Sequence, residues 1–161
     1  MKKYSVLIIV FISVISIFLI FLSFRSNFPH TPPTLEVSAQ NDNIKFSADT
    51  NGGNWFDSSN GKGGNSFDLG TYDSEKLAGI NEHNISVNTK IKLNLSYDKD
   101  IKLFKVYLIN QKSLSNENNQ EVKLSNNTFT TPKEPGIYGY IVDSFWDESH
   151  NIRFILKLNC K

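Results

Sequence analysis

Residues 137–159 read IYGYIVDSFWDESHNIRFILKLN, two long apolar runs that flank a short polar stretch. In the second run, apolar side chains recur at every second position from Ile152 onward, and Arg153 begins the opposite, more polar series. A period of two is typical of a β-strand with one buried face, because successive side chains of a strand point to opposite sides. We therefore predict two antiparallel strands, residues 137–146 and 152–159, joined by residues 147–151.

Working outward from this pair, other segments show the same alternation and are separated by polar turns. Residues 101–109 are apolar on both faces, as in a central strand, and no segment after residue 25 has a convincing helical period. Residues 74–80 would form at most one or two helical turns. This pattern predicts an all-β fold, an antiparallel sandwich or barrel. The other predicted strands are residues 34–39, 44–48, 90–97, 122–124 and 128–131, with weaker ones at 54–57 and 66–69.

The amino-terminal segment has a different character. Residues 6–24 contain no charge, proline or glycine, and they follow Lys2 and Lys3. As a helix this run would be about 28 Å long, close to the ~30 Å hydrocarbon core of a bilayer. The run is longer than the apolar part of a typical signal peptide and lacks a clear cleavage site, so we favour a retained signal-anchor over a cleaved leader. The basic start predicts a cytoplasmic amino terminus and an extracellular domain at the cell membrane.

These features divide the chain. We expect a cytoplasmic stub at 1–4, a transmembrane helix at 5–25, a proline-containing linker at 26–33 and one extracellular β domain at 34–161. Beyond residue 25 the chain holds 14 basic and 16 acidic residues, which gives no basic footprint for nucleic acid. Its single cysteine, Cys160, excludes a disulfide within one chain. That cysteine lies on the apolar face of the last strand, so we expect a buried thiol rather than an intermolecular disulfide.

The stretch Pro135-Gly136-Ile137-Tyr138-Gly139-Tyr140 resembles the tyrosine corner of immunoglobulin-like sandwiches. The chain from Pro33 to Asn159 is also similar to an uncharacterised family of small secreted or membrane-anchored immunoglobulin-like domains of Gram-positive bacteria. This resemblance implies an immunoglobulin-like fold at the cell envelope and brings no catalytic residues with it. It depends on Pro33, Leu35 and Val37, on Gly53 and Trp55, on Asp73 to Leu77, on the strand Lys90 to Tyr97, and on Phe129, Pro132, Lys133, Gly136, Tyr138, Tyr140 and Trp146.

Candidate chemistry is sparse. Asp57 and Asp68 have the spacing of the first and last ligands of a helix-loop-helix calcium loop, but Lys62 replaces the glycine that its sharp turn needs. Ser96 and Lys99 fit the S-x-x-K pattern of penicillin-recognising enzymes, but they lie on a predicted strand end instead of a helix. The three histidines are dispersed and fall in predicted loops, where we expect them on the surface. We therefore predict no catalytic residues, no metal site and no cofactor.

Aromatic residues suggest where a ligand would bind. Trp55, Phe56, Phe67 and Tyr72 lie in and around the glycine-rich stretch 52–70, and loops on a rigid sandwich often form binding surfaces. The alternative is that these rings cover one end of the core. The polar loop 110–120 is a second candidate.

The sequence therefore favours a membrane-anchored, extracytoplasmic binding domain that is not an enzyme. Its expected partners are the bilayer, through residues 5–25, and an envelope protein or extracellular ligand of unknown identity, with no nucleic acid. Two alternatives stay open: an accessory or inhibitory subunit of a membrane enzyme, and a small envelope hydrolase.

Overall fold

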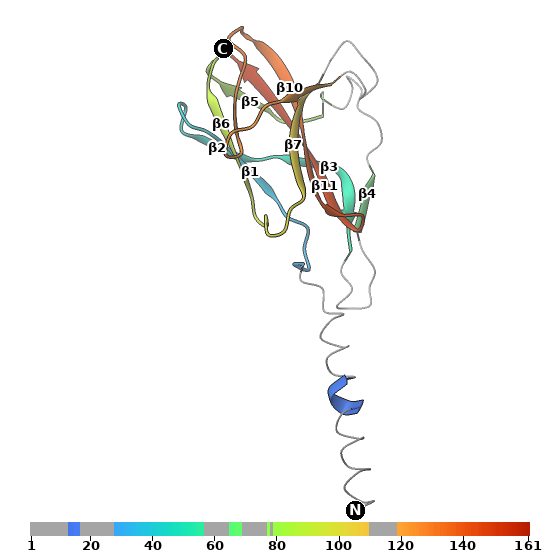
Figure 1. The fold of residues 1–161 in the computed structure, drawn as a ribbon. Helices are drawn as coiled ribbons and strands as arrows, with labels where there is room; N and C mark the ends of the chain where they lie inside the picture. Colours follow the sequence, from blue (N-terminus) through green and yellow to red (C-terminus); the bar gives the residue numbers. More distant parts are fainter. Residues whose placement is uncertain (1–12, 17–27, 57–64, 69–76, 78, 110–118) are drawn as a thin grey trace, which may run out of the picture.

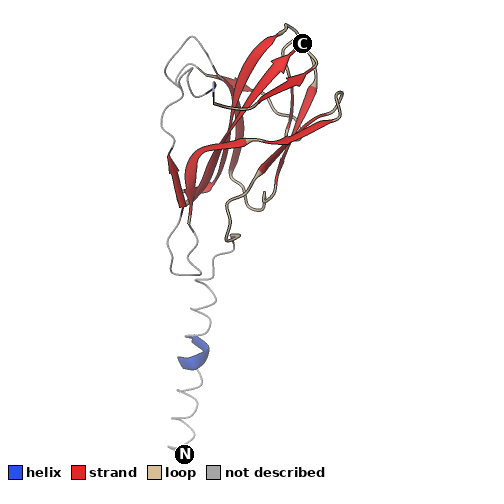
Figure 2. Ribbon diagram, turned by 180° about the vertical axis from the view of Figure 1, so that it is seen from behind, coloured by secondary structure: helices blue, strands red, loops and turns tan. Residues whose placement is uncertain are grey.

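A computed structural model describes residues 13–16, 28–56, 65–68, 77, 79–109 and 119–161. This part of the chain forms eleven strands in two sheets, so the predicted all-β sandwich is confirmed (Figures 1 and 2). One sheet has the order β2-β1-β6-β9, and the other has the order β4-β3-β11-β10-β7-β8, with β5 beside β11. The strands are β1 Leu35–Ala39, β2 Ile44–Ser47, β3 Asp49–Trp55, β4 Asn65–Asp68, β5 Glu82–Ile85, β6 Lys90–Leu95, β7 Leu103–Leu108, β8 Gln120–Val122, β9 Thr128–Thr130, β10 Gly136–Asp147 and β11 His150–Cys160.

The hairpin of β10 and β11 is the largest paired unit of the sandwich, as the opening stretch of sequence predicted. Its register places Tyr140 opposite Leu156 and Val142 opposite Phe154, and these side chains are buried between the two sheets. The free side of β11 is also paired. Strand β3 runs antiparallel to its first half, and β5 runs parallel to its second half. Strand β11 is therefore hydrogen-bonded along both edges.

The first sheet covers the inner face of this hairpin. Strands β1 and β6 contribute Leu35, Val37, Ile91 and Leu93, each fully buried, and they pack against the inward residues of β10 and β11. Cys160 belongs to the same core, which confirms the predicted buried thiol. On the outer face of the second sheet, a smaller cluster of Leu77, Ile141 and Ile155 is also buried.

The predicted turn before Thr128 is present, but the strands on its two sides do not pair with each other. Asn126 and Asn127 have φ values of 50° and 54°, and Ser125 and Thr128 exchange backbone hydrogen bonds across them. Strand β8 pairs with β7 and β9 pairs with β6, so this turn lies where the chain passes from one sheet to the other. Alternation of apolar and polar residues predicts a strand, but it does not identify the strand with which it pairs.

A tyrosine corner is present at the start of β10. The Tyr138 hydroxyl donates a hydrogen bond of 3.0 Å to the backbone oxygen of Glu134, four residues earlier. Two residues later, Tyr140 is buried and its ring centroid lies 4.8 Å from that of Phe129.

The predicted transmembrane helix lies mostly outside the described residues. Residues 13–16 form a helical turn, whereas residues 1–12 and 17–27 are not described. Within the part of the chain that the structure describes, no helix has the length and apolar character needed to cross a membrane.

Strand β3 starts earlier than predicted because the Asn51-Gly52-Gly53 stretch lacks the apolar alternation on which the prediction depended. A bulge interrupts its register with β11 between Arg153 and Phe154. Gly53 has a φ of +127°, and a β-carbon at this position would lie 2.2 Å from the backbone oxygen of Asn151. A glycine is therefore required both by the backbone conformation and by the closeness of the neighbouring strand.

Replacing Gly53 with alanine should lower the free energy of unfolding by about 2 kcal/mol or more, because the methyl group adds a clash to an unfavourable backbone conformation. Urea unfolding followed by tryptophan fluorescence measures this change. Thr50→Ala, at an exposed position of the same strand, is the matched control and should cost less than about 1 kcal/mol. Equal effects of the two substitutions would contradict the requirement for glycine.

Candidate functional site

The structure places only part of the predicted binding face. Trp55 is 1% exposed and belongs to the core, whereas the adjacent Phe56 is 46% exposed. The backbone of Phe67 pairs with Gly53 across β3 and β4, and Tyr72 lies outside the described residues. Neighbouring side chains at the end of a strand point to opposite sides, which is why Trp55 and Phe56 differ so strongly in exposure.

One end of the sandwich holds a cluster of aromatic rings that the sequence does not place together. We call it the aromatic end, and it consists of Phe28, Trp55, Tyr97, Trp146 and His150. The two indoles meet edge to face with centroids 5.3 Å apart, and the His150 ring lies 5.0 Å from Trp55. Phe28 stacks on His150 at 3.8 Å and also meets Trp55 edge to face. The rings therefore form one continuous packed group.

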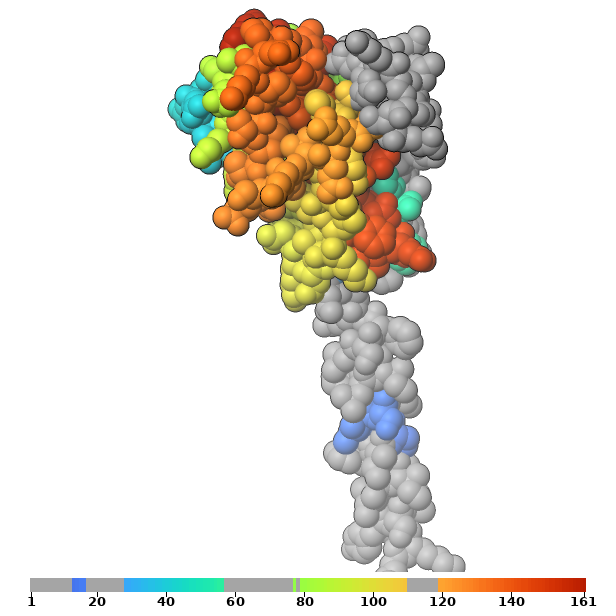
Figure 3. All heavy atoms as spheres, turned by 45° about the horizontal axis from the view of Figure 1, so that its top comes forward, coloured from blue at the N-terminus to red at the C-terminus, as the bar shows by residue number. Residues whose placement is uncertain are grey.

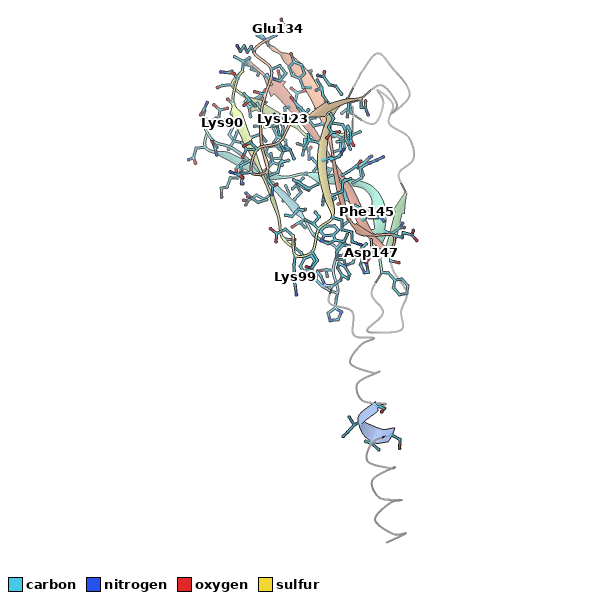
Figure 4. The ribbon with its side chains drawn as sticks, in the orientation of Figure 1. Lys90, Lys99, Lys123, Glu134, Phe145 and Asp147 are labelled. Atoms are coloured by element: carbon cyan, nitrogen blue, oxygen red, sulfur yellow. The ribbon has the colours of Figure 1, made fainter. Side chains whose placement is uncertain are left out.

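Four separate parts of the chain bring these rings together. Trp55 ends β3, Trp146 lies one residue before the end of β10, and His150 begins β11. Tyr97 follows β6, and Phe28 precedes β1. Figure 4 shows Phe145 and Asp147 on one side of this end and Lys99 on the other. In Figure 3, residues near 100 (yellow) lie beside the C-terminal residues (orange and red), as the pairing of β7 with β10 requires.

His150 makes two polar contacts although it is 7% exposed. Its Nε2 lies 2.8 Å from the backbone oxygen of Phe56, and its Nδ1 lies 2.8 Å from Oδ1 of Asp147. Both partners are acceptors when the carboxyl is ionised, so each contact is a hydrogen bond where the facing ring nitrogen carries a proton. Phe28 stacks on the same ring.

The contact with His150 affects the pKa of the Asp147 carboxyl. Partial burial alone would raise its pKa, but hydrogen bonds from His150 and from the backbone N–H of Ser149 outweigh burial and lower the pKa below its ordinary value of 3.8. The carboxylate form is therefore favoured in the folded chain.

Both indole N–H groups of the aromatic end donate to the backbone of a neighbouring segment. Trp55 Nε1 donates to the oxygen of Pro29 at 2.9 Å, and Trp146 Nε1 donates to the oxygen of Lys99 at 3.1 Å. Residues 28 and 29 belong to the predicted linker 26–33, yet they pack against the sandwich. The end of the domain and the start of the linker thus form one packed unit.

These contacts limit the chemistry of the site. Both ring nitrogens of His150 already have partners, and rings cover its faces, so it is poorly placed to exchange protons with a substrate. Among the described residues, no group of three His, Cys, Asp or Glu side chains could hold a metal ion. Burial raises the pKa of the Cys160 thiol, which disfavours the reactive thiolate. The contacts of the aromatic end are those of a packed cluster.

The prediction of surface histidines is wrong for His150. The expected turn covered residues 147–151, whereas only residues 148 and 149 lie between β10 and β11, so His150 is the first residue of β11 and its ring is buried. The signal was available in the sequence, because His150 has the same parity as Ile152 and Phe154 and so falls on the inward face of that strand. His83 is also in a strand, β5, where it stacks on Phe46 at 3.5 Å.

No family model, curated protein or solved structure matches this chain.

His150→Phe should lower the free energy of unfolding by about 1–3 kcal/mol. A ring is kept, but the Phe56 oxygen loses the His150 nitrogen as its partner, and the Asp147 carboxylate keeps only the hydrogen bond from the Ser149 N–H. Chemical denaturation measures the difference. His83→Phe makes the same chemical change in another ring stack without removing these two contacts, and it should cost clearly less. A His150 variant as stable as the His83 variant would show that ring packing alone holds the aromatic end.

The lowered pKa of Asp147 predicts a contribution to stability that depends on pH. The unfolded chain binds this proton at a higher pH than the folded chain, so the contribution is present above the ordinary value of 3.8 and is lost as the pH falls through the lower, folded value. The unfolding free energies of the wild type and Asp147→Asn should therefore converge as the solution is acidified below about pH 4. Parallel stability curves from acid titrations would contradict this.

Proposed function

We propose that this protein is a membrane-tethered, extracytoplasmic binding domain with an immunoglobulin-like fold, and that it acts by interaction rather than by catalysis. The transmembrane signal-anchor is residues 5–25, with the amino terminus in the cytoplasm and the β domain outside the cell membrane. The partner is an envelope protein or another extracellular component.

The pairing of the strands supports the immunoglobulin-like assignment. In this fold the first, second and fifth strands are neighbours in one sheet, in that order. The third, sixth and seventh strands are neighbours in the other sheet, also in that order. Taking β1, β6, β7, β9, β10 and β11 as those strands reproduces both sets of neighbours. The tyrosine corner at Tyr138 then falls at the start of the sixth strand. Strands β2 to β4 form an insertion, which separates β1 from β5, the strand that runs parallel to β11.

The observation that carries the proposal is the packing of Phe28 and Pro29 on the aromatic end. The sequence between the apolar run 6–24 and Phe28 is only Arg25-Ser26-Asn27. Phe28 and Pro29 thus follow the apolar run closely and pack on the core of the domain. This packing holds the domain at a defined place beside the anchor. A fixed location raises the effective concentration toward partners in the same membrane.

The chemistry of the described residues supports a role in binding. The close contact between His150 and Asp147 is enclosed by rings and a backbone oxygen. A hydrolase needs such a pair to reach its substrate. Recognition needs only a rigid framework that presents loops and strand faces to a partner. Strand β11, which is paired along both edges, supplies this rigidity.

Cysteine variants at exposed positions at different places on the domain, Lys123→Cys, Glu134→Cys and Glu148→Cys, test both topology and binding (Figure 4 labels the first two positions). We expect a membrane-impermeant, photoactivatable maleimide to label all three in intact cells, and illumination to capture one partner in near-stoichiometric yield from at least one position. The buried Cys160 gives the internal control, because its thiol should react only after unfolding.

Lys3→Cys should be labelled only after the membrane is opened. Labelling of this variant in intact cells, or failure to label the domain, would contradict the proposed topology. Labelling of all three domain positions without capture of any protein would contradict a protein partner. Capture of a membrane enzyme would assign the domain the accessory role.

A further inference from the structure

We propose that the aromatic end of the domain rests on the phospholipid headgroups of the membrane in which the chain is anchored, with Phe56 and Leu103 as the side chains that enter the interface. This inference rests on the proposed anchor at residues 5–25. It adds a second contact with the bilayer, made by the folded domain itself.

The length of the connection places this end close to the bilayer. Four peptide steps separate Phe24, the last residue of the apolar run, from Phe28, and a fully extended chain of that length spans about 14 Å. The headgroup layer on each side of a bilayer is about 5–8 Å thick. Since Phe28 stacks on His150 and meets Trp55, the aromatic end cannot lie far from the headgroups.

The exposed apolar side chains are distributed as this placement requires. Within the described part of residues 28–161, three large apolar side chains are more than one third exposed: Phe56, Leu103 and Ile137. The first two lie beside the aromatic end. Phe56 contacts the turn after β10 through its N–H, which donates to Ser149, and Leu103 lies opposite Phe145 in the register of β7 and β10. Ile137 lies near the other end of β10.

Aromatic rings with a polar handle favour the boundary between water and lipid. The two indole N–H groups of the aromatic end donate hydrogen bonds within the domain, and these bonds hold Pro29 and the loop at Lys99 in position. This leaves Phe56 and Leu103 to project from a rigid base. Figure 4 shows that the labelled Lys99 lies at this same end of the molecule.

The charges of this end point to zwitterionic rather than anionic headgroups. The exposed cations of the loop between β6 and β7 are Lys99 and Lys102, and Asp98 and Asp100 lie beside them. Such a mixed surface has no net attraction for an anionic membrane but can pair with both charges of phosphatidylcholine. Binding should therefore depend little on salt.

Energy transfer from tryptophan to dansyl-labelled headgroups in phosphatidylcholine vesicles tests the proposal on the full chain. Both tryptophans of the protein, Trp55 and Trp146, are at the aromatic end, so native fluorescence reports its position. Strand β10 has twelve residues, and its ends lie about 40 Å apart, so the opposite orientation of the domain would place the tryptophans far from the lipid. We expect strong energy transfer from the two tryptophans to the dansyl groups.

A longer tether separates affinity from mere proximity. Twelve flexible Gly/Ser residues inserted between Asn27 and Phe28 add a root-mean-square reach of about 20 Å. We expect this spacer chain to keep most of its transfer. Adding Phe56→Ser to it should lower the ratio of docked to undocked domains about tenfold, the effect of exposing most of one apolar side chain. Ile137→Ser is the matched control, because Ile137 and Phe56 are both 46% exposed, and it should change nothing.

Flotation of the vesicles after an alkaline wash identifies which proposal has failed. A chain that does not float would contradict the anchor and, with it, this inference. A chain that floats but loses its transfer once the spacer is present would leave the anchor intact and overturn the lipid contact. Crosslinking of the spacer chain to its own copies through Cys substituted at Phe56 would also overturn it, because a second copy would then cover this surface.

Discussion

The whole sandwich depends on the hydrogen bonding of strand β11 along both edges. Strand β10 occupies one edge over nearly the full length, while β3 and β5 share the other, one antiparallel and one parallel. This leaves no open edge at the centre of the larger sheet, where an unpaired strand would invite association with other chains. It also fixes which face of β11 points inward, so that Ile152, Phe154 and Leu156 meet the first sheet.

Strand β3 contains a bulge within its pairing with β11, on the way to the aromatic end. The bulge and Gly53 allow β3 to approach β11 closely before the chain reaches Trp55. Trp55 then meets Trp146 and His150, which the turn between β10 and β11 delivers from the other side. Each polar atom of these three rings has a backbone or carboxylate partner, so a large aromatic cluster is buried without unpaired donors.

The proposed function and the proposed lipid contact both follow from this end of the molecule. Phe28 and Pro29 pack on it, and only three residues separate Phe28 from the apolar run 6–24. In the proposed orientation the turn around Glu134 points away from the membrane, since Glu134 and Lys99 lie at opposite ends of the domain (Figure 4). The contacts of Phe28 and Pro29 would then set the orientation of the domain as well as its location.

The sequence by itself determined most of the strands and the inward faces of the longest ones, because alternation with a period of two reports burial directly, as in 137–146 and 152–159. It also predicted the tyrosine corner and the buried Cys160. It did not predict β5 or the first half of β3, which lack this alternation. It did not determine which strands pair, since β8 and β9 adjoin the same turn but join different sheets. Nor did it place Phe28 and Trp55 beside the hairpin that carries Trp146 and His150, because these three parts of the chain are far apart in sequence and carry no shared local pattern. Only the tertiary structure could decide such contacts, which depend on the register of strands that are distant in sequence.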